Sequence, residues 1–100
     1  MDVRTMSVIV DGKRYRTEAA ELLASDVNSA GTSKEHVGRN TFLFRTNKGG
    51  YFMQHQTTWP GEYDSLTPLA REEAFRIFTE LPTKMMEYEE AFPGVKIEDA

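Results

Sequence analysis

The sequence predicts an α+β fold: a small antiparallel sheet of four or five strands, built on a central β-hairpin and packed by one or two C-terminal helices. Residues 39–56 contain two apolar, aromatic runs on either side of Asn-Lys-Gly-Gly at residues 47–50, which is a hairpin pattern. Residues 67–92 instead repeat apolar side chains at helical spacing. Because 100 residues is the size of one domain, we expect a single domain over residues 1–100, with a tail from about residue 95.

The N-terminal segment predicts a second, smaller hairpin. Residues 6–10 are rich in β-branched side chains, and Asp11 and Gly12 after them both tolerate positive φ, as a two-residue turn requires. Residues 13–16 form the return strand. Residues 17–25 leave two structures open: a short helix capped by Thr17, or one helical turn followed by a strand over residues 22–27.

A polar loop is expected next, over residues 28–38, because this stretch is rich in Ser, Gly, Thr and Asn. The central hairpin that follows has two possible registers. A three-residue turn with Gly49 in the left-handed region pairs Phe44 with Phe52, whereas a two-residue turn pairs Phe44 with Met53. In the first register one face carries Phe42, Phe44 and Phe52, and the other carries Leu43, Arg45, Tyr51, Met53 and His55. The second of these faces has no obvious cover.

Proline and threonine mark the C-terminal helices. Thr67 is a good helix cap and Pro68 suits the first helical position. Pro82 ends that helix, and Thr83 then caps a second one, which residues 93–94 close.

Composition and charge argue against several functional classes. The net charge of −4 disfavours general nucleic-acid binding, for which Arg39, Arg45 and Lys48 would have to form one basic stripe. The absence of cysteine excludes disulfides, thiolate metal sites and a cysteine nucleophile. No apolar run approaches the roughly 20 residues that cross a bilayer, and no apolar signal core follows Met1. We therefore expect a cytoplasmic protein that makes no membrane contact.

Three stretches carry a resemblance to known sequences: residues 12–17, residues 42–52 and residues 66–74. They resemble a group of small, uncharacterised prokaryotic proteins, some of them from phages and other mobile elements. The resemblance implies a small α+β domain, favours a strand after Thr17 and implies no activity. The chain departs from the group at Ala70, where a hydroxyl-bearing cap is expected, and this moves the predicted helix start back to Thr67.

No catalytic residue, metal site or cofactor is predicted. His36 and His55 lie on different elements, with no Asp or Glu at ligand spacing. None of the serines occupies a sharp turn between a strand and a helix, as hydrolase nucleophiles do. Gly49 and Gly50 beside Lys48 precede a strand, whereas a phosphate-binding loop precedes a helix. We therefore expect a protein that is not an enzyme.

The surplus of aromatic side chains around the hairpin predicts a protein-binding surface. Its predicted residues are Arg45, Tyr51, Met53, His55 and Trp59, with Arg39 and Tyr63 adding to the same composition. A second copy of the chain is the simplest partner, which makes a homodimer the expected form. The resemblance to phage and mobile-element proteins implies an inhibitory or accessory role. Two alternatives stay open: a helix and the tail cover both faces of the hairpin, or a small-ligand pocket or active site forms around Gln54, His55 and Trp59.

Overall fold

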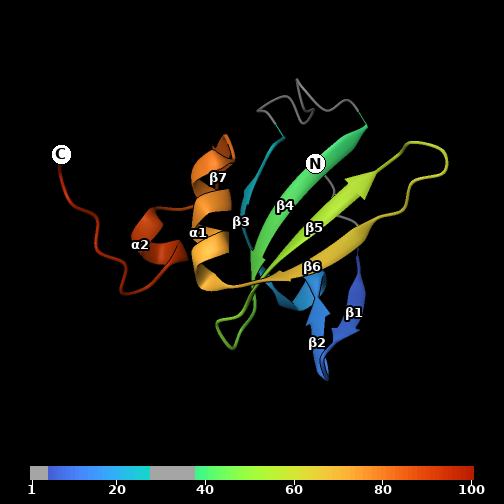
Figure 1. Ribbon diagram of the computed structural model, residues 1–100, viewed down its shortest axis with the longest axis horizontal. Coiled ribbons are helices and arrows are strands. Elements are labelled where there is room, and N and C mark those ends of the chain that lie inside the picture. The colour runs from blue at the N-terminus through green and yellow to red at the C-terminus, as the bar shows by residue number, and fades with distance from the viewer. Residues whose placement is uncertain (1–4, 28–37) are drawn as a thin grey trace.

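The computed structural model describes residues 5–27 and 38–100 (Figure 1). In these residues five antiparallel strands form one sheet in the order β6-β5-β4-β3-β7, and two further strands form a separate hairpin. Helix α1 (Arg71–Glu80) packs against the five-stranded sheet. The predicted α+β fold is therefore confirmed.

The N-terminal hairpin is the one that the sequence predicts. Strands β1 (Ser7–Val10) and β2 (Lys13–Arg16) pair antiparallel. Asp11 and Gly12 form the turn between them with φ of 52° and 76°. These left-handed values match the right-handed twist of the two strands, which is why Asp-Gly is favoured here.

Residues 17–25 adopt the second of the two predicted structures. A single 3-10 turn covers Thr17–Ala19, and strand β3 follows at Glu21–Ser25. A bulge between Leu22 and Ala24 interrupts the pairing of β3 with β4. Leu22 therefore packs on one face of the sheet, whereas Leu23 and Ala24 pack on the other. The loop predicted over residues 28–38 lies outside the described residues, apart from Gly38.

The central hairpin has the first of the two predicted registers. Strands β4 (Arg39–Arg45) and β5 (Tyr51–Thr57) pair Phe44 with Phe52. The three-residue turn is closed by the Thr46 N–H, which donates to the Gly50 carbonyl at 2.8 Å. Gly49 has φ of 86°, in the left-handed region that this turn requires.

The start of helix α1 was predicted wrongly. Thr67 and Pro68 belong to strand β6 (Ser65–Leu69), where they pair with β5. Since β6 is an edge strand, it tolerates a proline that has no N–H to donate. The helix begins only at Arg71, and the Ala70 N–H donates to Glu73 Oε1 at 3.1 Å in place of a hydroxyl cap.

The second C-terminal helix is shorter than predicted and begins later. Thr83 is not its cap, because Thr83–Lys84 form strand β7, which pairs with β3. Helix α2 is a single turn at Tyr88–Ala91. The prediction that residues 93–94 close the segment is consistent with a φ of 86° at Gly94. No helix or strand follows in residues 95–100.

Both faces of the sheet are covered at least in part. Helices α1 and α2 lie on one face, over a core formed by Leu23, Ala24, Leu43, Tyr51, Ala74, Phe78, Leu81, Ala91 and Phe92. The opposite face packs on residues of the N-terminal segment, over a core formed by Val27, Phe42, Phe44 and Phe52. Tyr15 of β2 joins this second core, with its ring centroid 5.7 Å from that of Phe52. Among the described residues no helix is both long and apolar enough to cross a membrane.

Candidate functional site

The helix-facing side of the central hairpin divides into two halves. The closed half consists of Leu43, Arg45 and Tyr51, which lie beneath α1 and α2. The open half consists of Thr41, Met53 and His55, which remain partly exposed. In Figure 1 the strands β4, β5 and β6 continue beyond α1. The predicted binding residues are therefore split between a covered and an uncovered region.

In the closed half, Arg45 and Tyr51 hold helix α2. The Tyr51 hydroxyl donates to the Ala91 carbonyl at 2.9 Å, and its ring stacks on Phe92 with centroids 5.0 Å apart. The Arg45 guanidinium donates to the carbonyls of Glu90 and Ala91. With 4% of its surface exposed, Tyr51 does not reach the protein surface. These two residues contact the chain's own C-terminal segment.

The open half brings Met53 and His55 to the same face but leaves Gln54 on the other. Consecutive strand residues point to opposite faces of a sheet. Gln54 is accordingly buried in the opposite core, where its amide nitrogen contacts Met6 Sδ at 3.9 Å. Gln54 and His55 therefore do not line one pocket.

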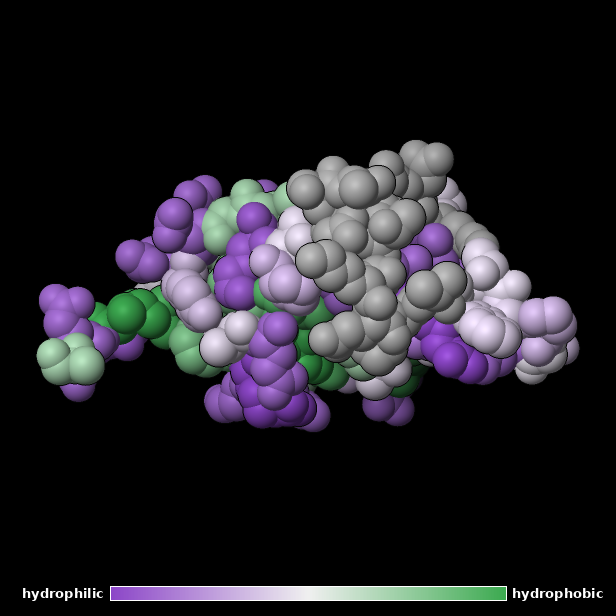
Figure 2. Space-filling model, turned by 90° about the horizontal axis from the view of Figure 1, so that it is seen from above, coloured by the Kyte–Doolittle hydropathy of each residue, from purple (hydrophilic) through white to green (hydrophobic). Residues whose placement is uncertain are grey.

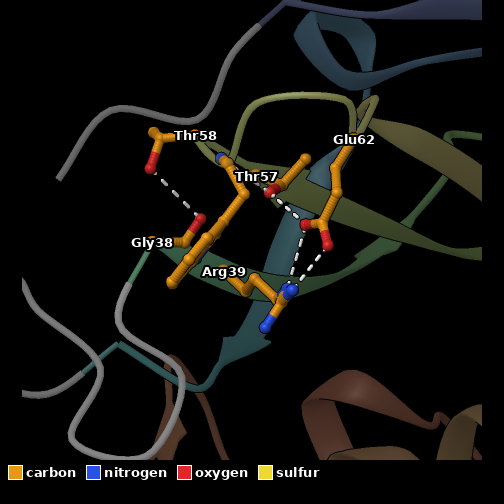
Figure 3. Close-up of polar contacts among 6 residues, drawn as sticks. Gly38, Arg39, Thr57, Thr58 and Glu62 are labelled. Carbon is orange, nitrogen blue, oxygen red and sulfur yellow. Dashed lines mark hydrogen bonds and ion pairs between the residues drawn. The ribbon is translucent and has the colours of Figure 1, made fainter.

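A polar network joins Arg39, at the start of strand β4, to Thr57 and Glu62 (Figure 3). The Arg39 guanidinium lies 5.0 Å from the Trp59 ring centroid and donates through Nε to Glu62 Oε1 at 2.9 Å. A second bond joins Arg39 Nη2 to Glu62 Oε2. The Thr57 hydroxyl donates to Glu62 Oε1 at 2.7 Å. Arg39 is thus held between an aromatic ring and a carboxylate.

The same contacts perturb the ionisation of Glu62. The hydrogen bonds from Arg39 and then Thr57, together with the positive charge of Arg39, lower the pKa of Glu62 from 4.5 to about 2. The Glu62 carboxylate in turn raises the pKa of Arg39. At neutral pH both partners are therefore fully charged.

We call residues 58–64, which link β5 to β6, the connector. Its backbone is fixed at both ends, because the Thr58 N–H donates to the Gly38 carbonyl at 2.8 Å and the Thr57 N–H donates to Asp64 Oδ1 at 2.9 Å. Trp59 lies against Gly38, where an added Cβ would stand 2.6 Å from the indole Nε1. Gly38 has φ of 82° as well, so glycine is required there for two reasons.

The connector carries two exposed aromatic side chains. Trp59 is 47% exposed and Tyr63 is 86% exposed. Sequence reasoning identified Trp59 but missed Gly38 and Glu62, which hold it in place. The sequence contains no signal for the role of Glu62. Glu62 and Arg39 are distant in sequence and meet only because the strands pair.

The other predicted sites are not assembled among the described residues. Arg39 and Arg45 lie at opposite ends of β4 and each pairs with a carboxylate, so they do not form a basic stripe with Lys48. Within residues 5–27 and 38–100, no three His, Cys, Asp or Glu side chains are grouped so that they could hold a metal. A hollow of about 250 Å³ is lined by Arg71, Glu72, Phe75, Phe92 and Val95, none of which is a predicted site residue.

Comparison of the chain with models of protein families, with curated proteins and with solved structures gives no match. The resemblance drawn from residues 12–17, 42–52 and 66–74 gains no support from them.

Proposed function

We propose that this chain is a small, non-enzymatic protein–protein interaction module that binds a partner through the connector and the open half. The observation that carries the proposal is the placement of Trp59, which is exposed and yet held by Gly38 and Arg39. Tryptophan, tyrosine and arginine are the residue types that contribute most to binding at protein interfaces. Trp59, Tyr63 and Arg39 supply one of each at one end of the sheet.

The rigidity of the connector supports the same proposal. Association is opposed by the entropy lost when interface side chains and loops become ordered. Here the connector is already fixed by the bond from the Thr58 N–H to the Gly38 carbonyl and by the bond from the Thr57 N–H to Asp64, and Trp59 already lies against the Arg39 guanidinium. A partner would therefore meet a surface that needs little further ordering.

The proposed surface keeps part of the predicted one and replaces the rest. Met53, His55 and Trp59 remain, because they lie on the open half or the connector. Arg39 and Tyr63 take the place of Arg45 and Tyr51, whose contacts are with α2. The resemblance to phage-type proteins favours an accessory or inhibitory role for such binding.

The test is site-specific photo-crosslinking in the native host. A photoreactive amino acid is placed at Tyr63 and, as a matched control, at Met85, which is 45% exposed and follows strand β7 at the opposite edge of the sheet. We expect a protein that is crosslinked from position 63 and not from position 85, and whose crosslinking falls when Trp59→Ala is introduced. Equal crosslinking of the same proteins from both positions, or no effect of Trp59→Ala, would overturn the proposal.

A further inference from the structure

The outer face of the N-terminal hairpin is a second surface with a distinct chemistry. Cross-strand pairing places Val8 opposite Tyr15 and Ile9 opposite Arg14. Tyr15 packs on the sheet through Phe52, so its side of the hairpin faces inward. The opposite side, which we call the outer hairpin face, is formed by Ser7, Ile9, Arg14 and Arg16.

This face combines an exposed apolar side chain with two exposed arginines. Ile9 is 62% exposed, although it lies in the middle of a strand pair. Arg14 and Arg16 are exposed, and neither forms an ion pair with any other residue that the structure describes. The neighbouring carboxylates belong to Asp11, in the turn, and Glu18, beyond the end of β2. The two arginines place a local positive charge on a chain whose net charge is −4.

The backbone of the N-terminal hairpin is held in place by hydrogen bonds and by a contact with the sheet. The Met6 N–H donates to Thr17 Oγ1 at 2.9 Å, and the Thr17 N–H donates to the Met6 carbonyl at 3.0 Å. These bonds close the open end of the hairpin, and the Tyr15–Phe52 contact fixes it to the sheet. Ile9, Arg14 and Arg16 are therefore presented by a fixed backbone.

The same chain offers a segment of complementary chemistry at residues 95–100, Val-Lys-Ile-Glu-Asp-Ala. The Val95 N–H still donates to the Phe92 carbonyl at 3.0 Å, whereas residues 96–100 extend from the body in Figure 1. Ile97 is 55% exposed, and Glu98 and Asp99 after it are exposed as well. Figure 2 shows hydrophobic and hydrophilic spheres side by side at this projecting end.

We propose that the outer hairpin face binds residues 96–100 of a second copy of this chain. Ile97 packs on Ile9, and the carboxylates of Glu98 and Asp99 lie beside the two arginines. The occupant is a second copy because the segment runs away from the hairpin of its own chain (Figure 1). Each copy carries both elements, so two copies can exchange these segments reciprocally, and the proposed assembly is the twofold dimer that such an exchange closes.

Reciprocity matters because one such contact is weak. Exposed ion pairs contribute little each and are screened by salt. Once the first segment is bound, however, the second contact forms within one assembly at a high effective concentration. We therefore expect a reversible dimer whose population rises with protein concentration and falls with added salt.

A charge exchange tests the proposal by sedimentation equilibrium of the full chain. One variant carries Arg14→Glu and Arg16→Glu, and the other carries Glu98→Lys and Asp99→Lys. In each variant alone, both contacts bring like charges together, so we expect dimerisation to weaken at least about tenfold. In a mixture of the two variants both contacts again join opposite charges, and we expect a heterodimer as stable as the wild-type dimer. A mixture that stays monomeric, or a wild-type chain that is monomeric up to about 1 mM, would overturn the proposal.

A matched control distinguishes residues 96–100 from the other acidic segment of the chain. Glu87→Lys combined with Glu89→Lys makes the same change of charge at exposed positions around α2. We expect this variant to dimerise like the wild-type chain. If it loses the dimer while the Glu98→Lys, Asp99→Lys variant keeps it, the assignment to residues 96–100 is wrong. Circular dichroism of each variant establishes that the fold is retained.

Discussion

The closed and open halves of the helix-facing surface come from the same two strands, β4 and β5. The closed half contacts the chain's own C-terminal segment, whereas the open half remains partly exposed. In the closed half, Arg45 and Tyr51 donate to carbonyls of α2, and Phe92 fills the space above Tyr51. At the far end of the open half, Arg39 supports a tryptophan that remains exposed. The closed half is core because α1 and α2 lie over it, whereas the side chains of the open half remain partly exposed.

The largest effect expected from this comparison is the loss of the cover over the closed half. Phe92 is completely buried, and its ring meets those of Phe75 and Phe78 edge to face at 5.2 and 5.5 Å. We expect Phe92→Ala to lower the free energy of unfolding by about 3–5 kcal/mol, as large-to-small changes of buried aromatic residues do. Urea denaturation followed by circular dichroism measures it.

The matched control for this prediction is Trp59→Ala in the connector. It removes an even larger aromatic ring, but one that is 47% exposed. We expect its effect on the free energy of unfolding to stay within about 1 kcal/mol, because substitutions away from the core are usually mild. If Phe92→Ala and Trp59→Ala lowered the free energy of unfolding equally, the connector would be as important to the core as the cover of the closed half.

The sequence predicted the central hairpin and limited its register to two possibilities, because the causes are local. Gly49 supplies the positive φ of the three-residue turn, and the turn then fixes the partners of Phe42 and Phe44. The turn Asp11–Gly12 specifies the N-terminal hairpin in the same way. In both cases the signal for a hairpin lies in a few adjacent residues.

The C-terminal elements could not be predicted because their causes are distant in sequence. Thr67 and Pro68 carry a sound helix-start signal, but pairing with β5 outweighs it. A one-turn helix such as α2 has no stability of its own, and Arg45 and Tyr51 position it from the other half of the chain. The burial of Tyr51 follows from that placement. The aromatic composition therefore predicted a larger exposed surface on the hairpin than the structure has, because Tyr51 is buried.

A smaller loss in the free energy of unfolding is expected at Gly38, which lies against Trp59 at the open end of the sheet. Gly38→Ala places a side chain at a φ of 82°, which costs about 1–2 kcal/mol, and its Cβ also clashes with the Trp59 indole. Gly49→Ala is the matched control, because φ is 86° there and nothing lies within 4 Å. We expect both variants to be destabilised, and Gly38→Ala more so.

The fluorescence of Trp59 separates the two glycine variants further. Since the chain has one tryptophan, its emission reports directly on the connector. We expect Gly38→Ala to shift the emission maximum of the folded protein and Gly49→Ala to leave it unchanged. If neither variant shifts the emission, Trp59 is not seated against Gly38.

The smallest effect expected is the pH dependence of the connector. Hydrogen bonds from Arg39 and Thr57 lower the pKa of Glu62 in the folded chain to about 2, from an ordinary value of 4.5. A group whose pKa is lowered on folding stabilises the fold above its unfolded pKa and loses that contribution as the pH falls through its folded pKa. The contribution of Glu62 is therefore complete above pH 4.5 and declines between 4.5 and about 2.

Protonation of Glu62 removes the negative partner of Arg39, which is the residue stacked on Trp59. We therefore expect the fluorescence of Trp59 in the folded protein to change as the pH falls through about 2, where Glu62 takes up its proton, with little change in stability because the pair is exposed. Glu62→Gln cannot ionise, so this variant should lack the transition, whereas Glu80→Gln, in the exposed pair with Arg76 on α1, should retain it. A transition that persists in Glu62→Gln would assign the change to another carboxylate. The connector would then keep its arrangement without the ion pair, and backbone bonds and the contact with Gly38 would be what positions Trp59.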